Sequence, residues 1–411
     1  MDHWLVSSLQ YSPFMQPALL LVLGMLAQWL AWRLHMPSIL FLLLAGLLAG
    51  HFGWLNPDRL LGDLLKPVVG FSVGLILFEG SLSLRLEELR QSGQVVWRLI
   101  TTGTVVTWIL ASLAGWLLLD FSPGLAILLG AILTVTGPTV VLPLLDYVKP
   151  TGKAGHILKW EGILIDPVGA MLAVFVFETL LNIGSGTLLT QIVMGVLKTI
   201  TLSAVIGLTS GLIFNTLIER RLIPEFLQNP MALTAVLATY AIANLVQQES
   251  GLVAVTVMGV MLANRRQSDI RNIVQFKEDL RVLLLSVLFV MLAARLDIDN
   301  LMHLGKQALW FAGLLIFIIR PFSVWLCTRN SELSWQEKTY LACIAPRGIV
   351  AASVSAVFAL ELSHAGYFDA DRLSLVVFLV ILCTVAFYSL LAKPLAGWLK
   401  LRDDSTQQNL L

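Results

Sequence analysis

Two carboxylates, Glu161 and Asp166, lie five residues apart in a stretch that runs into the apolar segment Met171 to Phe177. An ionisable side chain at the centre of a membrane costs about 2.5 to 3.5 kcal/mol on insertion scales, so it usually faces a watery cavity or a charged partner. The alternative is a structural polar group that a neighbouring helix satisfies. Because Pro167 follows directly and a second carboxylate is near, we favour a functional site at Asp166.

A third charge separates the roles of these carboxylates. Glu161 and Asp166 point about 140° apart on an α-helix, so they cannot serve one pocket from the same face. Arg320 follows the uncharged run Leu309 to Ile319 and needs an anionic partner, for which Glu161 is the natural candidate. We therefore expect a structural Glu161–Arg320 pair. Asp166 is then the titrating group, and a proton and a cation compete for it because desolvation penalises its charged form.

The segment from Leu133 to Pro143 combines hydroxyl side chains with helix breakers. Pro138 deprives the carbonyl of Thr134 of its helical partner, and Gly137 lowers the cost of unwinding. A freed carbonyl can coordinate a cation. Side-chain oxygens for the same purpose are available on Thr134, Thr136 and Thr139.

A second break is expected where proline, arginine and glycine follow one another at Pro346, Arg347 and Gly348. For either break alone an ordinary packed kink is the alternative, since proline kinks are common in membrane helices. Two breaks in corresponding halves favour function, because transporters bind substrates where discontinuous helices meet near the midplane. Glu79, beside Gly80 at the end of an apolar run, is a further candidate ligand, with an interfacial cap residue as the alternative.

Composition restricts the class of protein that must hold these residues. Of 411 residues, 57% are apolar and 13% charged, which excludes an ordinary soluble enzyme. Apolar runs of about 20 residues recur, without the alternation of a membrane barrel, so we expect an all-α polytopic membrane protein. No nucleophile, metal-ligand or phosphate-loop motif occurs, which predicts neither an enzyme nor a cofactor. The net charge of +1 suggests no nucleic-acid partner, and the three cysteines are interpreted as core residues.

About thirteen transmembrane helices are expected, beginning near Met15 with a helix rather than a cleaved signal peptide. Their ranges are 16–34, 37–54, 65–83, 94–119, 123–146, 153–182, 187–219, 229–247, 251–264, 274–294, 302–328, 335–361 and 369–399. Lys and Arg near helix ends number 18 on one side and 5 on the other, so the N-terminus is expected outside and the C-terminal tail in the cytoplasm. Arg281, Glu178 and Glu249 are interpreted as solvated surface charges.

The chain 1–411 is expected to form one membrane transporter unit without a soluble domain. Its two halves, 16–182 and 229–399, show weak similarity and are joined by a connector helix at 187–219. An offset of seven helices inverts the second half, which predicts an inverted repeat with two crossed discontinuous helices. Chance similarity between apolar segments is the alternative.

Five short motifs occur in order along the chain and are specific in combination. They are Phe78-Glu79-Gly80, Thr136-Gly137-Pro138, Glu161 to Pro167, Ile319-Arg320-Pro321 and Pro346-Arg347-Gly348. Together they resemble the cation/proton antiporter 1 family, which includes NhaP-type exchangers. The resemblance implies a homodimer with a dimerisation domain and a mobile core domain. It also implies elevator-like alternating access and exchange of Na⁺, K⁺ or Li⁺ for H⁺.

By this resemblance Asp166 is the essential aspartate, Glu161 and Arg320 are its supporting ion pair, and Glu79 and the region of Thr136 supply ligands. Three positions depart from the family pattern. Ile165 replaces a usual asparagine, Gly162 a usual serine and Gly137 a common acidic residue. Fewer fixed ligands would suit the weakly hydrated K⁺, and a single aspartate implies electroneutral exchange.

The resulting hypothesis is a secondary-active antiporter of the bacterial inner membrane, which exchanges a monovalent cation for protons at Asp166 and serves pH homeostasis. Its partners are then these ions, membrane lipid and a second copy of the chain. Two alternatives stay open at this point. An organic-anion or bile-acid-type symporter would use Arg347 to attract its substrate, and a channel or non-transporting sensor would show no proton coupling.

Overall fold

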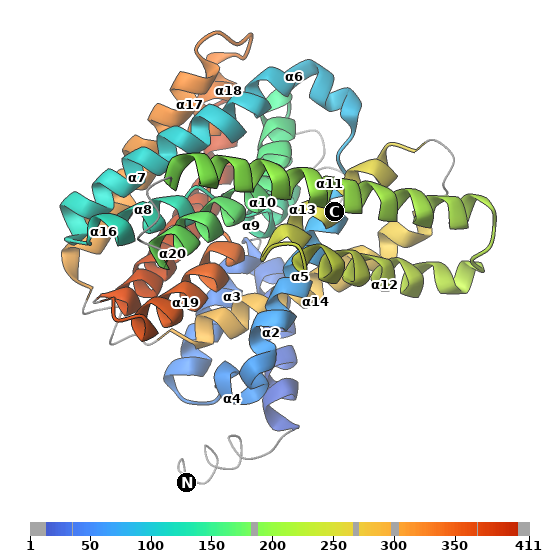
Figure 1. The fold of residues 1–411 in the computed structure, drawn as a ribbon, viewed down its shortest axis with the longest axis horizontal. Coiled ribbons are helices and arrows are strands. Elements are labelled where there is room, and N and C mark those ends of the chain that lie inside the picture. The colour runs from blue at the N-terminus through green and yellow to red at the C-terminus, as the bar shows by residue number, and fades with distance from the viewer. Residues whose placement is uncertain are drawn as a thin grey trace.

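The computed structural model describes residues 14–34, 36–181, 188–265, 271–296, 304–367 and 369–401, and every secondary-structure element in these ranges is a helix (Figure 1). Seven of the described helices are long and apolar enough to cross a membrane, and seven further apolar helices are 10 to 17 residues long. The expectation of an all-α polytopic membrane protein is therefore confirmed. The predicted C-terminal tail and the charges Lys277, Glu278 and Asp279 lie outside the residues whose side chains the structure describes.

The helices follow the expected ranges closely along the chain. In the first half they are α2 (Met15–Leu34), α3 (Ser38–His51), α4 (Pro57–Leu61), α5 (Leu65–Ser81), α6 (Leu86–Arg98), α7 (Thr104–Leu119), α8 (Pro123–Ile132), α9 (Pro138–Val148) and α10 (Lys153–Leu181). In the second half they are α11 (Leu188–Glu219), α12 (Glu225–Asn244), α13 (Ser250–Ala263), α14 (Arg271–Ala294), α16 (Gly305–Leu314), α17 (Arg320–Thr328), α18 (Trp335–Ala342), α19 (Ile349–His364) and α20 (Ala370–Trp398).

Two bundles make up the packing of these helices. Helices α2, α3, α5 and α11 to α14 pack on one another, whereas α7 to α10 pack with α16 to α20. Helix α10 contacts both groups and runs through the middle of the molecule in Figure 1. In the most apolar 18-residue stretch of α10, 67% of the residues are buried, whereas the corresponding stretch of α2 has 22% buried. Helix α10 is therefore surrounded by protein rather than lipid. This is the helix that carries Glu161 and Asp166.

Serine caps begin α8 and α18, the first parts of the two interrupted helices. Ser122 accepts a hydrogen bond from the backbone N–H of Leu125, and Pro123 fixes the first helical dihedral. Ser334 forms a reciprocal capping box with Glu337. Both helices then stop after one short run, 10 residues for α8 and 8 for α18.

Both interruptions predicted from the sequence are present. Residues 133–137 separate α8 from α9, and residues 343–348 separate α18 from α19. The two non-helical segments touch at Gly137 and Gly348, where a Cβ atom on either glycine would overlap the Cα atom of the other. Glycine is needed here because the two backbones leave no room for a side chain.

The helices expected at 94–119 and 302–328 are less regular than predicted. Each contains a five-residue π-helical segment, η2 (Leu99–Gly103) and η3 (Leu315–Ile319). The hydroxyl of Ser323 donates to the carbonyl of Gly103 at 3.2 Å, which supplies η2 with a partner from the second half. Segment η3 ends directly before Arg320, so the widened turn sets the direction in which this arginine leaves its helix. The first of these helices also starts earlier, at Leu86, with the strongly amphipathic α6.

Candidate functional site

Asp166 lies in the middle of α10 with no exposed surface. Neither carboxylate oxygen has a hydrogen-bond partner among the described residues. An ionised carboxylate in such surroundings carries a large desolvation cost, which a bound proton or a bound cation removes. That Asp166 exchanges one for the other stays a prediction.

The first helix break lies beside α10 near this carboxylate. A Cβ atom on Gly169, one turn after Asp166, would lie 2.8 Å from the hydroxyl oxygen of Thr134. Thr134 donates its own hydroxyl to the carbonyl of Ala131 at 2.8 Å. The hydroxyls of Thr136 and Thr139 are buried and have no hydrogen-bond partner among the described residues. Two oxygens suited to a cation are thus available in this break.

Arg347 joins the two breaks to each other. Its Nη1 atom donates to the carbonyls of Thr134 at 3.2 Å and Val135 at 3.0 Å, and its backbone N–H donates to Thr384 Oγ1. The side chain is 1% exposed. A cation at the carbonyl end of α8 offsets the partial negative charge of that helix end. The Thr134 carbonyl, expected from the sequence to be free for a cation, therefore accepts from Arg347 in this structure.

Arg320 plays the corresponding role at the end of α18. It forms a two-pronged ion pair with Glu161, in which Nη2 lies 2.9 Å from Oε2 and Nη1 bonds Oε1. It also donates to the carbonyls of Leu341 at 3.1 Å and Ile344 at 3.3 Å. The two residues that charge balance joins in the sequence are thus paired in the structure. Both Glu161 oxygens are used by the arginine, which leaves Asp166 as the carboxylate available to a cation.

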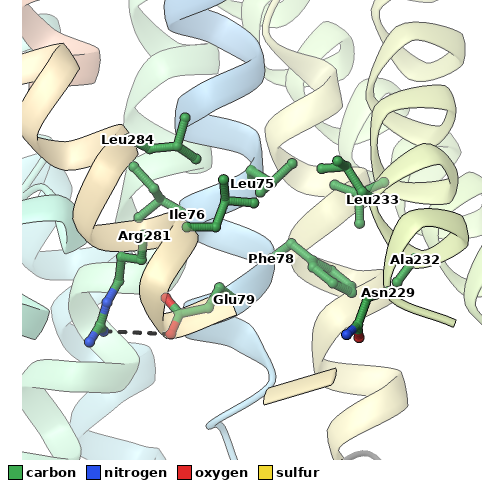
Figure 2. A pocket seen from close by; sticks show the side chains of 11 residues that line it. Leu75, Ile76, Phe78, Glu79, Asn229, Ala232, Leu233, Arg281 and Leu284 are labelled. Carbon is green, nitrogen blue, oxygen red and sulfur yellow. Dashed lines mark ion pairs between the residues drawn. The ribbon is translucent and has the colours of Figure 1, made fainter. Parts of the chain in front are cut away.

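Glu79 lies at the end of α5 and faces Arg281 of α14 (Figure 2). The nearest side-chain atoms of this pair are 3.6 Å apart, and Arg281 also lies 3.2 Å from Asp146 of α9. The interpretation of Arg281 as a solvated charge is wrong, because its side chain is 19% exposed and lies between two carboxylates. A role for Glu79 at the cation site stays a prediction.

Two other acidic residues interpreted as surface charges also differ from expectation. Glu249 is partly buried and lines a cavity between α5, α12, α13 and α19. Glu178 accepts a hydrogen bond from the amide of Gln247 at 2.6 Å. The sequence signal for Glu249 is its place between Gln248 and Ser250, where a polar loop joins two short apolar segments. Loop position alone does not reveal that the loop faces inward.

The described residues contain no cluster of His, Cys, Asp or Glu that could hold a metal through several protein ligands. All three cysteines are free thiols, and Cys327 is buried, as expected of a packing residue. A weakly coordinated monovalent ion, held by one carboxylate together with hydroxyl or water oxygens, suits the donors around Asp166.

Broken helices that meet beside a buried carboxylate, with a fully buried ion pair one turn away, define a membrane transporter of small ions. The chain belongs to the transmembrane sodium/hydrogen exchanger family, whose model matches residues 18–398. The resemblance found in the sequence motifs is confirmed. The expectation of a transporter rather than an enzyme is confirmed with it.

Individual relatives agree with this family. The K⁺/H⁺ antiporter NhaP of Alkalimonas amylolytica is 28% identical over 394 residues, covering 93% of this chain and 66% of that protein. The Na⁺/H⁺ antiporter 1 of Methanocaldococcus jannaschii is 28% identical over 358 residues, covering 84% of this chain and 82% of that protein. The chain spans somewhat less than two thirds of the Alkalimonas protein. The solved map of the sodium proton antiporter MjNhaP1 from M. jannaschii matches with a TM-score of 0.80 at 25% identity, covering 93% of this chain and 96% of that one.

Proposed function

We propose that this protein is a monovalent cation/proton antiporter in which Na⁺, K⁺ or Li⁺ and H⁺ compete for the carboxylate of Asp166. The observation that carries the proposal is a fully buried carboxylate beside a broken helix with two buried hydroxyls, none of which has a hydrogen-bond partner among the described residues. Relatives named as K⁺/H⁺ and Na⁺/H⁺ antiporters support it. The transported ions are substrates, and the proposal includes no resident cofactor.

In the proposed cycle Asp166 carries either a proton or a cation when it changes sides. The cation binds the ionised carboxylate with help from the hydroxyl oxygens of Thr136 and Thr139, after the proton has left to water. A proton from the other side later displaces the cation. One positive charge moves each way, so the exchange is electroneutral. Arg347 and the Glu161–Arg320 pair hold the breaks in place throughout.

The elements divide the work in this proposal. The bundle of α7 to α10 and α16 to α20 moves as an elevator against the bundle of α2, α3, α5 and α11 to α14, which forms a homodimer with a second copy. The two breaks act as crossed discontinuous helices at the centre of an inverted repeat of about thirteen spans. The N-terminus lies outside and the C-terminal tail lies in the cytoplasm of a bacterial cell, with the chain in the inner membrane.

Ion preference follows from how few side-chain oxygens surround Asp166. Ile165 offers no oxygen, and the space beside Gly162 is filled by Val141, to which a Cβ atom would lie 3.5 Å away. Gly137 has no room for the acidic side chain that the family pattern has there, because it meets Gly348. A poorer shell leaves more of the coordination to water, which supports K⁺ as a substrate at least as good as Na⁺. Glu79 is the residue that would add a ligand.

The organic-anion alternative depended on Arg347. Because its Nη1 atom is engaged by two backbone carbonyls and its side chain is 1% exposed, this arginine is poorly placed to attract an anion. No second function is favoured by a specific feature of the site.

Proton flux in proteoliposomes tests the proposal. Asp166→Asn should abolish Na⁺- and K⁺-driven proton flux, whereas Asp58→Asn, at a carboxylate that is 61% exposed, should leave it unchanged. In the parent protein the apparent KM for the cation should rise as pH falls, because protons compete for the site. An imposed voltage should not change the rate. Robust cation-dependent flux in Asp166→Asn would overturn the assignment.

A further inference from the structure

A cavity of about 260 Å³ lies between the two bundles, at the end of the protein opposite the Glu79–Arg281 pair. Its walls come from α5, α12 and α13 of one bundle and from α19 of the other. The polar side chains that line it belong to Tyr240, Asn244, Gln248, Glu249 and Ser353. The volume holds several water molecules. Among the lining residues whose side chains the structure describes there is no Lys or Arg, and Glu249 is the one that carries a formal charge.

The register of α5 against α10 gives the position of this cavity relative to Asp166. Lys159 donates to the carbonyl of Ser83 at 2.8 Å, and a Cβ atom on Gly80 would lie 3.4 Å from the side chain of Ile163. The two helices are therefore antiparallel. Asp166 lies about 4.5 Å further along α10 than Ile163, at the level of Leu77 on α5. The first cavity residue on α5, Val73, is only about 6 Å beyond that level.

The floor of the cavity approaches the helix breaks. Val350 lines it and lies two residues after Gly348, which touches Gly137 of the first break. The cavity thus extends from the end of α12 toward the segment that holds the unpartnered threonine hydroxyls.

At the opposite end of the contact between the two bundles, where Glu79 lies, polar side chains join them. Lys159 of α10 bonds the backbone at Ser83, and Arg281 of α14 bonds Asp146 of α9, so two polar contacts link the bundles there. The pocket beside Glu79 at that end measures only about 20 Å³ (Figure 2). A pocket of about 190 Å³ between α2, α3, α9 and α20 also lies toward that end, beside Tyr147, and none of its lining residues carries a formal charge. The cavity of about 260 Å³ at Glu249 is the larger of these two and includes a carboxylate.

We propose that a monovalent cation reaches Asp166 through this cavity, entering from the side of the membrane on which Glu249 lies. The cavity then serves as a vestibule, and the negative charge of Glu249 attracts the cation into it. The inference rests on the proposed function of Asp166 as the cation site. A single carboxylate with amide and hydroxyl oxygens around it favours a partly hydrated cation and repels an anion. Glu249 occupies the N-cap position of α13 with φ +64°, so the start of this helix determines the position of its Cβ atom.

Side-specific kinetics test the vestibule. Glu249→Gln keeps the shape of the side chain and removes its charge. In vesicles of known orientation it should raise the apparent KM for Na⁺ and K⁺ about three- to tenfold when the cation is added on the Glu249 side, with maximal rate and opposite-side KM changed less than about twofold. The increase should shrink when an inert salt screens the charge. The matched control is Glu361→Gln, which removes an exposed carboxylate from the C-terminal part of α19 and should change neither constant.

Ser353→Phe provides an independent check, because an aromatic ring would fill the cavity without changing its charge. It should slow cation uptake from the Glu249 side at unchanged thermal stability. If Glu249→Gln leaves the apparent KM for the cation unchanged on both sides, or raises it equally on both sides, the proposed role of the cavity as a vestibule is contradicted. Asp166→Asn, measured in parallel, separates the two proposals. If Asp166→Asn loses the flux while Glu249→Gln keeps the parent KM, the proposed site at Asp166 is supported and only the proposed vestibule is contradicted.

Discussion

Four charged side chains are buried near the centre of this protein and are stabilised in different ways. Glu161 has both oxygens bonded to Arg320, and Arg347 is bonded to backbone carbonyls. Asp166 has no hydrogen-bond partner among the described residues. The first arrangements hold a charge permanently, whereas the last favours a carboxylate that gains and loses a positive partner. Glu161 and Asp166 thus lie in one helix, yet only Glu161 is held by hydrogen bonds from the described residues.

Removing one member of the buried pair should destabilise the protein. In Glu161→Gln the guanidinium of Arg320 stays buried without its counter-charge, which costs about 3 to 5 kcal/mol. Thermal unfolding of the purified protein should show a clearly lowered midpoint. Asp58→Asn, which breaks the exposed pair with Arg295, should cost at most about 1 kcal/mol. Asp166→Asn should not lower the midpoint, because that carboxylate has no hydrogen bond to the described residues that it could lose. Equal midpoints for Glu161→Gln and the parent would contradict the structural role.

At the scale of elements, the two helix breaks depend on each other. Arg347 leaves the second break and bonds the carbonyl end of α8, while Arg320 bonds the carbonyl end of α18. The backbones meet at Gly137 and Gly348 without space for a side chain. The second break thus supplies a cation for the carbonyls of the first, and α17 supplies one for the carbonyls of the second. The two glycines allow the breaks to come into close contact.

A methyl group at this contact should disrupt both stability and exchange. The Cβ atom of Gly348→Ala would overlap backbone atoms of Gly137, which cannot rotate away as a side chain would. We expect a lowered unfolding midpoint and loss of cation-driven proton flux. Gly313→Ala is the matched control, because nothing lies within 4 Å of the added atom, and it should be neutral or stabilising by up to about 1 kcal/mol. Parent-like flux in Gly348→Ala would show that the breaks do not need this contact.

At the scale of the whole molecule, the question is whether the two bundles move against each other. Arg281 and Asp146 bridge the bundles, whereas Gln28 and Ser286, 3.2 Å apart at their side-chain tips, lie within one bundle. The cavity at one end and the polar contacts at the other describe one arrangement of the junction. Elevator transport requires a second arrangement in which the bundles have shifted and the site is reached from the other side of the membrane.

Cross-linking tests this movement in protein whose three native cysteines have been replaced by alanine. A short bifunctional thiol reagent that joins the cysteines of Arg281→Cys/Asp146→Cys should stop exchange, and a cleavable linker should restore it on reduction. The same reagent on Gln28→Cys/Ser286→Cys should leave exchange intact, because those helices belong to one bundle. Undiminished exchange with the first pair fully cross-linked would exclude relative motion at this position.

Much of the architecture follows from the sequence because it depends on local properties. Apolar runs determine the helices, proline and glycine determine both breaks, and the cost of a buried charge leads from Arg320 to Glu161 before any contact is known. The motifs also indicate the family correctly. The prediction that Asp166 is functional rests on the same reasoning, since an ionisable group in an apolar membrane helix is energetically costly.

Only the tertiary structure decided which groups meet across the chain. Arg281 bonds Asp146 over 135 residues and Arg347 bonds Thr134 over 213, and no local pattern selects such partners. The inward position of Glu249 and the crowding at Gly137 likewise depend on helices packed from other parts of the sequence. Local composition determines that a charge will be buried and a helix broken, whereas the packing of distant helices determines what each buried group contacts.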